Sequence, residues 1–210
     1  MKTVITIARS YGSGGKTLGK LLADKMGINC YDREIIRMAS DSSGINEELF
    51  GRVDEKLKKS PLFGIVRSNP YKGNGVIPPE SSNFVSDDNL FNYQAQVIKE
   101  LAEKESCVII GRCADYVLKD NPNVIRLYLY APLEDCIKRV MAQNSITEKE
   151  TIKKIETIDK YRSDYYKYYT GKEWNDARNY DVCLNTSKVS FDKCVDIIVN
   201  YLEIIKDMEK

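Results

Sequence analysis

The sequence predicts an α/β fold in which a parallel sheet is covered by helices on both faces. Short apolar runs alternate with longer segments of helical periodicity along the chain. A glycine-rich turn separates the first apolar run from the first helical segment, which is typical of a ligand-binding edge in such sheets. The length of 210 residues suits one compact domain with a sizeable core.

The strands and helices follow from the apolar pattern. Strands are predicted at residues 4–8, 28–31, 107–110, 124–130 and 181–184. Helices are predicted at residues 18–26, 91–105, 133–143, 147–169 and 191–206. Ligands in parallel sheets bind beyond the carboxyl ends of the strands, so we expect the site at that edge.

Two segments interrupt this alternation. Residues 44–88 begin with a helical pattern at Glu48, Leu49, Val53 and Leu57. Residues 60–88 are rich in Pro, Gly, Ser and Asn and are too long for an ordinary connection, which predicts a functional or mobile insert. The second segment, residues 149–171, is a predicted long helix with many lysines, arginines and tyrosines.

The glycine-rich turn matches a loop that binds the phosphates of a nucleotide. The pattern G-x-x-x-x-G-K-[ST] fits residues 10–17, except that Ser10 stands in place of the first glycine. The predicted cradle consists of Gly12, Ser13, Gly14, Gly15, Lys16 and Thr17. Its glycines let several N–H groups point at one phosphate, while Lys16 supplies a cation and the Thr17 hydroxyl a ligand for Mg²⁺. Glycine turns and Lys-Thr pairs also occur at ordinary helix starts, but the strand–turn–helix context favours phosphate binding.

Composition excludes several kinds of chemistry and partner. Lys and Arg number 32 against 31 Asp and Glu, so the net charge does not favour nucleic acid as a partner. The chain has no histidine and its six cysteines form no C-x-x-C pair, so the pattern predicts neither a zinc site nor a histidine general base. Any reaction must depend on positioning, cations and carboxylates.

The cysteines and the apolar runs also indicate the cellular compartment in which the protein is expected. Most cysteines lie in apolar stretches, which predicts buried free thiols in a reducing compartment. The first apolar run is too short for a secretory signal, and no segment approaches the length of a membrane span. We therefore expect a cytoplasmic protein that has no membrane partner.

Charged residues follow the second and third predicted strands. Asp32 comes directly after the second strand, and Arg33 and Arg37 share one helical face behind it. Arg112 follows the third strand. Arginine forks match phosphate, although solvated pairs with Glu34 and a cap on the sheet edge are the structural alternatives. No acidic residue ends the third strand to hold Mg²⁺ through water, and both Asp32 and Asp115 are candidates to replace it.

The run at residues 159–171 has two interpretations. Lys160, Asp164 and Lys167 share one helical face, and Arg162 is offset from it. Packing accounts for most of the tyrosines, with the charged side chains in water. The density of positive charge favours a lid that neutralises a transferring phosphoryl group.

These motifs, together with residues 179–187 (NYDVCLNTS), resemble the cytidylate kinase-like family over nearly the whole chain. The resemblance implies the P-loop fold of nucleoside monophosphate kinases, a three-layer α/β fold whose five parallel strands have the order 2-3-1-4-5. It also implies a single domain with a core at residues 1–43, 89–146 and 172–210, a monophosphate-binding insert at 44–88 and a lid at 147–171.

The resemblance assigns roles to individual residues. It implies ATP phosphates on residues 12–17, with Mg²⁺ on Thr17, and catalytic cations at Lys16, Arg112, Arg162 and Lys167. The acceptor nucleotide is expected at Asp32, Arg33, Arg37, Arg112 and Asp164. Arg112 matches the arginine of a Gly-Arg-Asp motif, in which Cys113 replaces the aspartate; Ser10 and Arg33 also depart from the family pattern.

The function expected from these residues is ATP-dependent phosphoryl transfer to a nucleoside monophosphate, with CMP or dCMP as the first choice. Because the groups that read cytosine are incomplete, two alternatives remain. One is a kinase of another small metabolite. The other is a nucleotide-binding regulator with little transfer activity.

Overall fold

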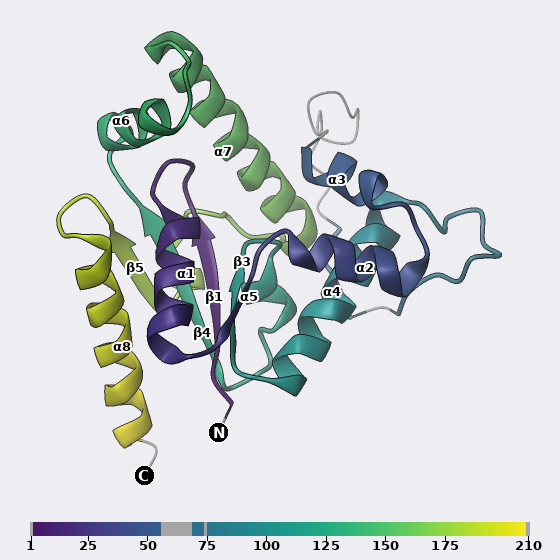
Figure 1. Cartoon of the computed structure of the whole chain (residues 1–210). Coiled ribbons are helices and arrows are strands. Elements are labelled where there is room, and N and C mark those ends of the chain that lie inside the picture. Colours follow the sequence, from purple (N-terminus) through teal and green to yellow (C-terminus); the bar gives the residue numbers. More distant parts are fainter. Residues whose placement is uncertain (1, 56–68, 74, 209–210) are drawn as a thin grey trace.

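A computed structural model describes residues 2–55, 69–73 and 75–208. The described residues form one sheet of five parallel strands in the order β2-β3-β1-β4-β5 (Figure 1), which confirms the predicted class and strand order. The strands are β1 (Val4–Arg9), β2 (Asn29–Tyr31), β3 (Cys107–Ile110), β4 (Val124–Tyr130) and β5 (Val182–Asn185). Of the predicted insert at residues 44–88, residues 56–68, which include Leu57, and residue 74 lie outside the described residues.

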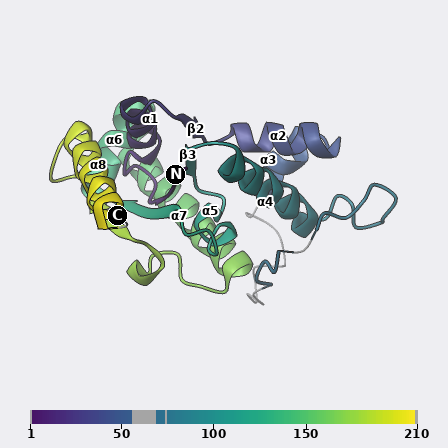
Figure 2. The same cartoon turned by 90° about the horizontal axis from the view of Figure 1, so that it is seen from below.

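Helices cover both faces of the sheet (Figures 1 and 2). Successive strand residues point to opposite faces, so Ile5 and Ile7 of β1 pack with α1 (Gly15–Met26) and α8 (Phe191–Met208). On the other face, Cys107 and Ile109 of β3 lie in a larger cluster. That cluster also contains residues of α4 (Asp87–Lys104), α5 (Ala114–Val117) and α7 (Glu148–Thr170).

The remaining helices lie beside this core. They are α2 (Glu34–Ser43), α3 (Glu47–Glu55), α6 (Leu133–Gln143) and the short 3-10 helix η2 (Ala177–Asn179). The four-residue helix α5 was not predicted, because so short an element shows no hydrophobic period. Helix α4 begins before its predicted start because the Ser86 hydroxyl accepts a hydrogen bond from the Asn89 N–H, which caps the helix there.

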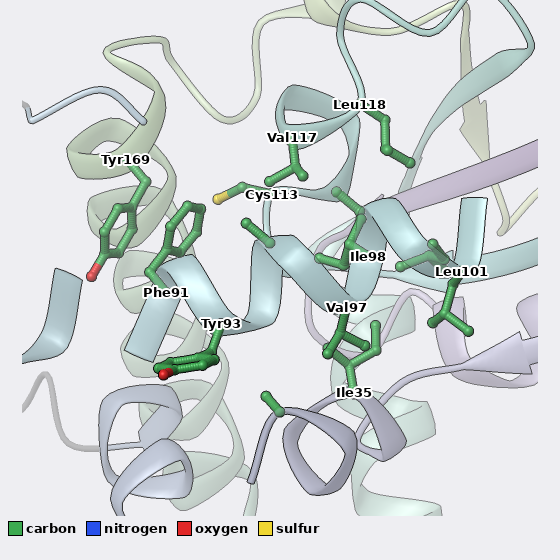
Figure 3. Packing of buried hydrophobic residues seen from close by; sticks show 14 of the residues in the cluster. Ile35, Phe91, Tyr93, Val97, Ile98, Leu101, Cys113, Val117, Leu118 and Tyr169 are labelled. Carbon is green, nitrogen blue, oxygen red and sulfur yellow. The ribbon is translucent and has the colours of Figure 1, made fainter. Parts of the chain in front are cut away.

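Helix α7 agrees with its prediction within one residue at each end. A reciprocal pair of hydrogen bonds between Thr147 and Glu150 caps its start, and Gly171 ends it in the left-handed conformation. Its tyrosines are core residues: Tyr165, Tyr166 and Tyr169 are buried. The ring of Tyr169 stacks on Phe91 of α4, with centroids 3.9 Å apart (Figure 3). Packing therefore accounts for these tyrosines.

The cysteines agree in part with the prediction of buried thiols. Cys107, Cys113, Cys136 and Cys194 are buried and free, whereas Cys183 is exposed. Cys183 is exposed because it lies on β5, the edge strand of the sheet, which pairs with β4 alone. No helix among the described residues combines the length and the apolar character needed to cross a membrane.

Candidate phosphotransfer site

The predicted phosphate-binding loop connects β1 to α1 at the carboxyl edge of the sheet (Figure 1). Gly12 and Gly14 have φ angles of 84° and 85°, the left-handed region that glycine enters without strain. No side chain caps the N-terminus of α1, and its first turn has no acidic residue. The side chain of Lys16 in that turn is 63% exposed. This helix start is therefore open to an anion.

Packing as well as conformation requires glycine in the loop. A Cβ atom on Gly14 would lie 2.5 Å from Cε1 of Phe191, and one on Gly15 would lie 2.6 Å from Cγ of Arg9. A Cβ atom on Gly12 would lie 2.9 Å from both Cβ and the carbonyl oxygen of Cys136. The loop thus lies close against α8, β1 and α6.

One side of the loop is held by a buried hydrogen-bond cluster. The Thr186 hydroxyl donates to the Ser13 carbonyl at 2.7 Å, and Nη1 of Arg139 donates to the same carbonyl at 3.2 Å. Arg139 also donates to the Thr186 hydroxyl at 3.0 Å and to its carbonyl at 2.7 Å. Thr186 belongs to the run at 179–187 that the sequence analysis noted, whereas Arg139 was not predicted. Thr186 positions the loop from directly after β5, and Arg139 does so from within α6.

Replacing Thr186 with valine is expected to lower the free energy of unfolding by about 1–3 kcal/mol. Valine keeps the shape but leaves the buried Ser13 carbonyl without the hydroxyl donor at 2.7 Å. Urea unfolding followed by circular dichroism measures this change. Thr157→Val is the matched control, because the Thr157 hydroxyl bonds only its own helix, and it should change stability by less than about 0.5 kcal/mol. Equal effects of the two substitutions would contradict the role of Thr186.

The other side of the loop is held by α7. The Tyr11 N–H donates to Oδ1 of Asp159 at 2.7 Å, and Nη1 of Arg162 donates to the Arg9 carbonyl at 2.9 Å. The Arg162 guanidinium and the Lys154 ammonium lie over the Tyr11 ring, at 5.6 and 5.7 Å from its centroid. Burial raises the pKa of Asp159, although Arg162 and the Tyr11 N–H act in the opposite direction.

Four charged residues of α7 were predicted to belong to a lid over the site: Lys160, Arg162, Asp164 and Lys167. In the described part of the chain, only Arg162 contacts the loop. Lys160 and Asp164 form an ion pair with each other at 2.9 Å. Lys167 pairs with Glu173 beyond the end of the helix. The contact by Asp159 was not predicted, because only the fold brings residue 159 to residue 11.

Asp32 lies between cations from two further elements. Its Oδ2 is 3.7 Å from Nζ of Lys16 at the start of α1. Its Oδ1 is 3.8 Å from Nη2 of Arg9 at the end of β1. Arg9 was not predicted as a site residue, although its place at the end of the first strand could have indicated it. Asp32 and Asp115 were both candidates to hold Mg²⁺, and only Asp32 lies beside Lys16. Asp115 is instead buried against Tyr166, whose hydroxyl donates a hydrogen bond to it at 2.6 Å.

Arg112 lies beside Asp32 in a constrained conformation. Gly111, Arg112 and Cys113 have φ angles of 77°, 58° and 54°, and two of the three are not glycine. Nε of Arg112 donates to the Asp32 carbonyl at 3.0 Å, and its Nη1 donates to Oε1 of the buried Gln94 at 2.7 Å. The structure thus brings Arg112, Asp32 and Lys16 together. Gln94 was not predicted, because it lies within a helical apolar pattern.

The other predicted acceptor residues lie at the start of α2, directly after Asp32. Arg33 and Arg37 are both exposed there. Cys113, which stands where the family motif has an aspartate, is buried at the N-terminus of α5. Its side chain belongs to the large hydrophobic cluster (Figure 3).

A protein-family model described as "Cytidylate kinase-like family" matches residues 4–188. The chain belongs to the cytidylate kinase-like family. It is therefore a nucleoside monophosphate kinase-like phosphotransferase, and the match includes the loop, Asp32, Arg112 and α7.

Relatives of this cytidylate kinase-like chain cover nearly all of its length. A protein named cytidylate kinase from Methanosarcina mazei is 28% identical over 92% of this chain and 93% of its own. Another of that name, from Methanopyrus kandleri, is 26% identical over 100% of this chain and 97% of its own. An uncharacterized protein of known structure from Eubacterium ventriosum is 29% identical, with a TM-score of 0.69, over 96% of this chain and 99% of its own.

A more distant solved structure supports the fold and nothing further. Shikimate kinase from Acinetobacter baumannii, solved with shikimate, is 14% identical with a TM-score of 0.53. It covers 98% of this chain and 96% of its own. The cytidylate kinase-like chain therefore shares the architecture of P-loop kinases.

Proposed function

We propose that this protein transfers the γ-phosphoryl group of ATP to a nucleoside monophosphate, with CMP or dCMP as the preferred acceptor, in the cytoplasm. One observation carries the proposal: Lys16, Arg9 and Arg112 meet around Asp32 at the carboxyl edge of the sheet. Cations from a phosphate-binding loop and from the third strand thereby lie next to each other. That is the arrangement which two phosphate-bearing substrates in line require.

The loop residues fit the donor phosphates. The open N-terminus of α1 offers backbone N–H groups, and the exposed Lys16 offers a charge that is now shared with Asp32. The Thr17 hydroxyl, exposed in the same turn, and the Asp32 carboxylate are oxygen donors that suit Mg²⁺. When bound, Mg²⁺ would neutralise charge on the phosphates.

The acceptor phosphate is assigned to Arg112 with Arg33 and Arg37. Arg112 is held by the Asp32 carbonyl and by buried Gln94, so its guanidinium loses little freedom when it binds an anion. Exposed Arg33 directly precedes α2, whose first residue is Glu34, and exposed Arg37 lies within that helix. The guanidinium groups can bind phosphate oxygens bidentately.

In the proposed reaction an oxygen of the acceptor phosphate attacks the γ-phosphorus. The bond from that phosphorus to the β–γ bridging oxygen breaks, and ADP leaves with the electron pair. An ionised phosphate needs no general base, which agrees with a chain that has no histidine. Lys16 and Arg112 would stabilise the charge of the transition state, and Arg162 would do so from α7. Segments 44–88 and 147–171 are proposed to act as the monophosphate-binding insert and the lid.

A coupled assay for ADP formation tests the proposal. With ATP and Mg²⁺, CMP and dCMP are expected to give the highest kcat/KM among CMP, dCMP, UMP, AMP and GMP. Two cytidylate kinases at 28% and 26% identity support this order, whereas buried Cys113 in place of an aspartate weighs against strict cytosine reading. Turnover of none of the five monophosphates would overturn the proposal. ATP binding without ADP formation would favour the regulator, and ADP formation that needs a different small phosphate acceptor would favour the other alternative.

A further inference from the structure

A cavity lies away from the predicted phosphate-binding loop. Its volume is about 270 Å³, and it lies between α5, the first half of β4, the end of α7 and the segment that leads into β5. Its wall includes Tyr116, Lys119, Arg126, Tyr166, Lys172 and Asp181. None of these residues belongs to the loop, to the contacts that hold it, or to the group around Asp32.

Two lysines at this cavity share one aromatic ring. The ammonium groups of Lys119 and Lys172 lie 4.7 and 5.9 Å from the centroid of the Tyr116 ring. Lys119 follows α5 and Lys172 follows α7, so the fold brings them together from distant parts of the sequence. Among the described residues, neither ammonium has a carboxylate within 4.0 Å. Both charges therefore lie beside one ring without a contacting carboxylate in the described part of the chain, and the carboxylate that Lys172 influences at longer range is that of Asp176.

The interior of the cavity is built from fixed polar groups. Arg126 donates to the carbonyls of Asp115 and Lys119 at 3.4 and 3.0 Å, and it lies 3.7 Å from the Asp181 carboxylate. The Tyr166 hydroxyl donates to Asp115 at 2.6 Å. Burial raises the pKa of Asp115, although the hydrogen bond from Tyr166 and the charge of Arg126 act in the opposite direction.

We propose that this cavity binds a small organic phosphate monoester. The phosphate would lie between the ammonium groups of Lys119 and Lys172, which are point charges suited to a dianion. The volume of about 270 Å³ exceeds what a phosphate group fills, and Tyr116 and Tyr180 give the wall an aromatic surface for the organic part. The site is separate from the proposed donor and acceptor sites.

Binding can be measured without phosphoryl transfer in the Lys16→Ala variant, which weakens the phosphate affinity of the loop. Isothermal titration calorimetry with ribose 5-phosphate is the probe, and ribose and inorganic phosphate are the separate arms. In this background, replacing Lys119 and Lys172 with glutamine is expected to weaken the binding of ribose 5-phosphate at least tenfold. The pair Lys138→Gln and Lys206→Gln removes the same charge from two other exposed positions and should change affinity less than twofold.

Each of these binding measurements supports or overturns the proposed phosphate monoester site. Absence of ribose 5-phosphate binding, or an affinity that survives the loss of Lys119 and Lys172, would overturn it. Ribose binding as tightly as ribose 5-phosphate would overturn the role of the phosphate, and inorganic phosphate binding as tightly would overturn that of the organic part. Both lysines are exposed, so the variants should fold, which thermal unfolding checks. The outcome is independent of the proposed kinase activity, because the measurement uses a variant without transfer.

Discussion

Replacing Lys16 with alanine is expected to lower the rate of phosphoryl transfer at least about a thousandfold and to leave the fold intact. The ammonium group lies at the start of α1, where the proposed donor phosphates bind, and its charge is needed most when negative charge spreads in the transition state. Stability should change little because the side chain is 63% exposed and its ion pair with Asp32 is 3.7 Å long.

The measurement is ADP formation with saturating CMP and ATP, together with thermal unfolding of both proteins. Lys20→Ala is the matched control, since Lys20 is an exposed lysine one turn further along the same helix. It should retain activity within about threefold. A Lys16→Ala variant that is folded and retains a tenth or more of the wild-type rate would contradict the assignment of Lys16 to the donor phosphates.

Replacing Gly14 with alanine is expected to lower the free energy of unfolding by about 2–5 kcal/mol and to abolish nucleotide binding. The left-handed conformation at φ 85° costs a residue with a Cβ atom about 1–2 kcal/mol. The new Cβ atom would also lie 2.5 Å from Cε1 of Phe191, and such overpacking adds about 1–3 kcal/mol. Either the ring or the loop must move, and movement of the loop removes its N–H groups from the phosphates.

Two further variants separate the causes of this loss. At Gly27, φ is 66° and a Cβ atom would meet nothing within 4 Å, so Gly27→Ala should show the conformational part alone. The double variant Gly14→Ala with Phe191→Leu should recover part of the steric cost in a double-mutant cycle. Urea unfolding measures all of the variants. A loss at Gly14 no larger than that at Gly27 would show that the contact with Phe191 does not constrain the loop.

Much of the architecture could be predicted because it depends on local pattern. The run that became β3 is apolar on both faces and the run that became β1 is largely so, and a parallel sheet with helices on each side is the structure that buries such strands. Lys16 could be placed at a helix start because glycines and a strand precede it in the sequence. Asp32 and Arg112 could be placed at the same edge because each follows a predicted strand.

Other parts of the candidate site could not be predicted from spacing. Arg139, Asp159 and Gln94 each lie within a helix, where the sequence shows only one polar residue among many, and each reaches the loop or Arg112 across more than a dozen residues of chain. The contacts of the tyrosine-rich helix α7 could not be predicted from spacing either. Spacing could not show that Tyr169 packs on Phe91 in the core, or that Arg162 is the predicted cation of this helix that contacts the loop within the described residues.

The sequence by itself determined the α/β class, the strand–glycine turn–helix that is proposed to bind phosphate, and the family resemblance, because these depend on hydrophobic period and on residues that are close in the chain. Only the tertiary structure decided that Asp32, rather than Asp115, lies beside Lys16. It also decided that Lys119 and Lys172 each lie beside the ring of Tyr116. The physical reason is that Coulomb interactions and hydrogen bonds act over a few ångströms, and the burial of apolar side chains sets which distant residues come that close.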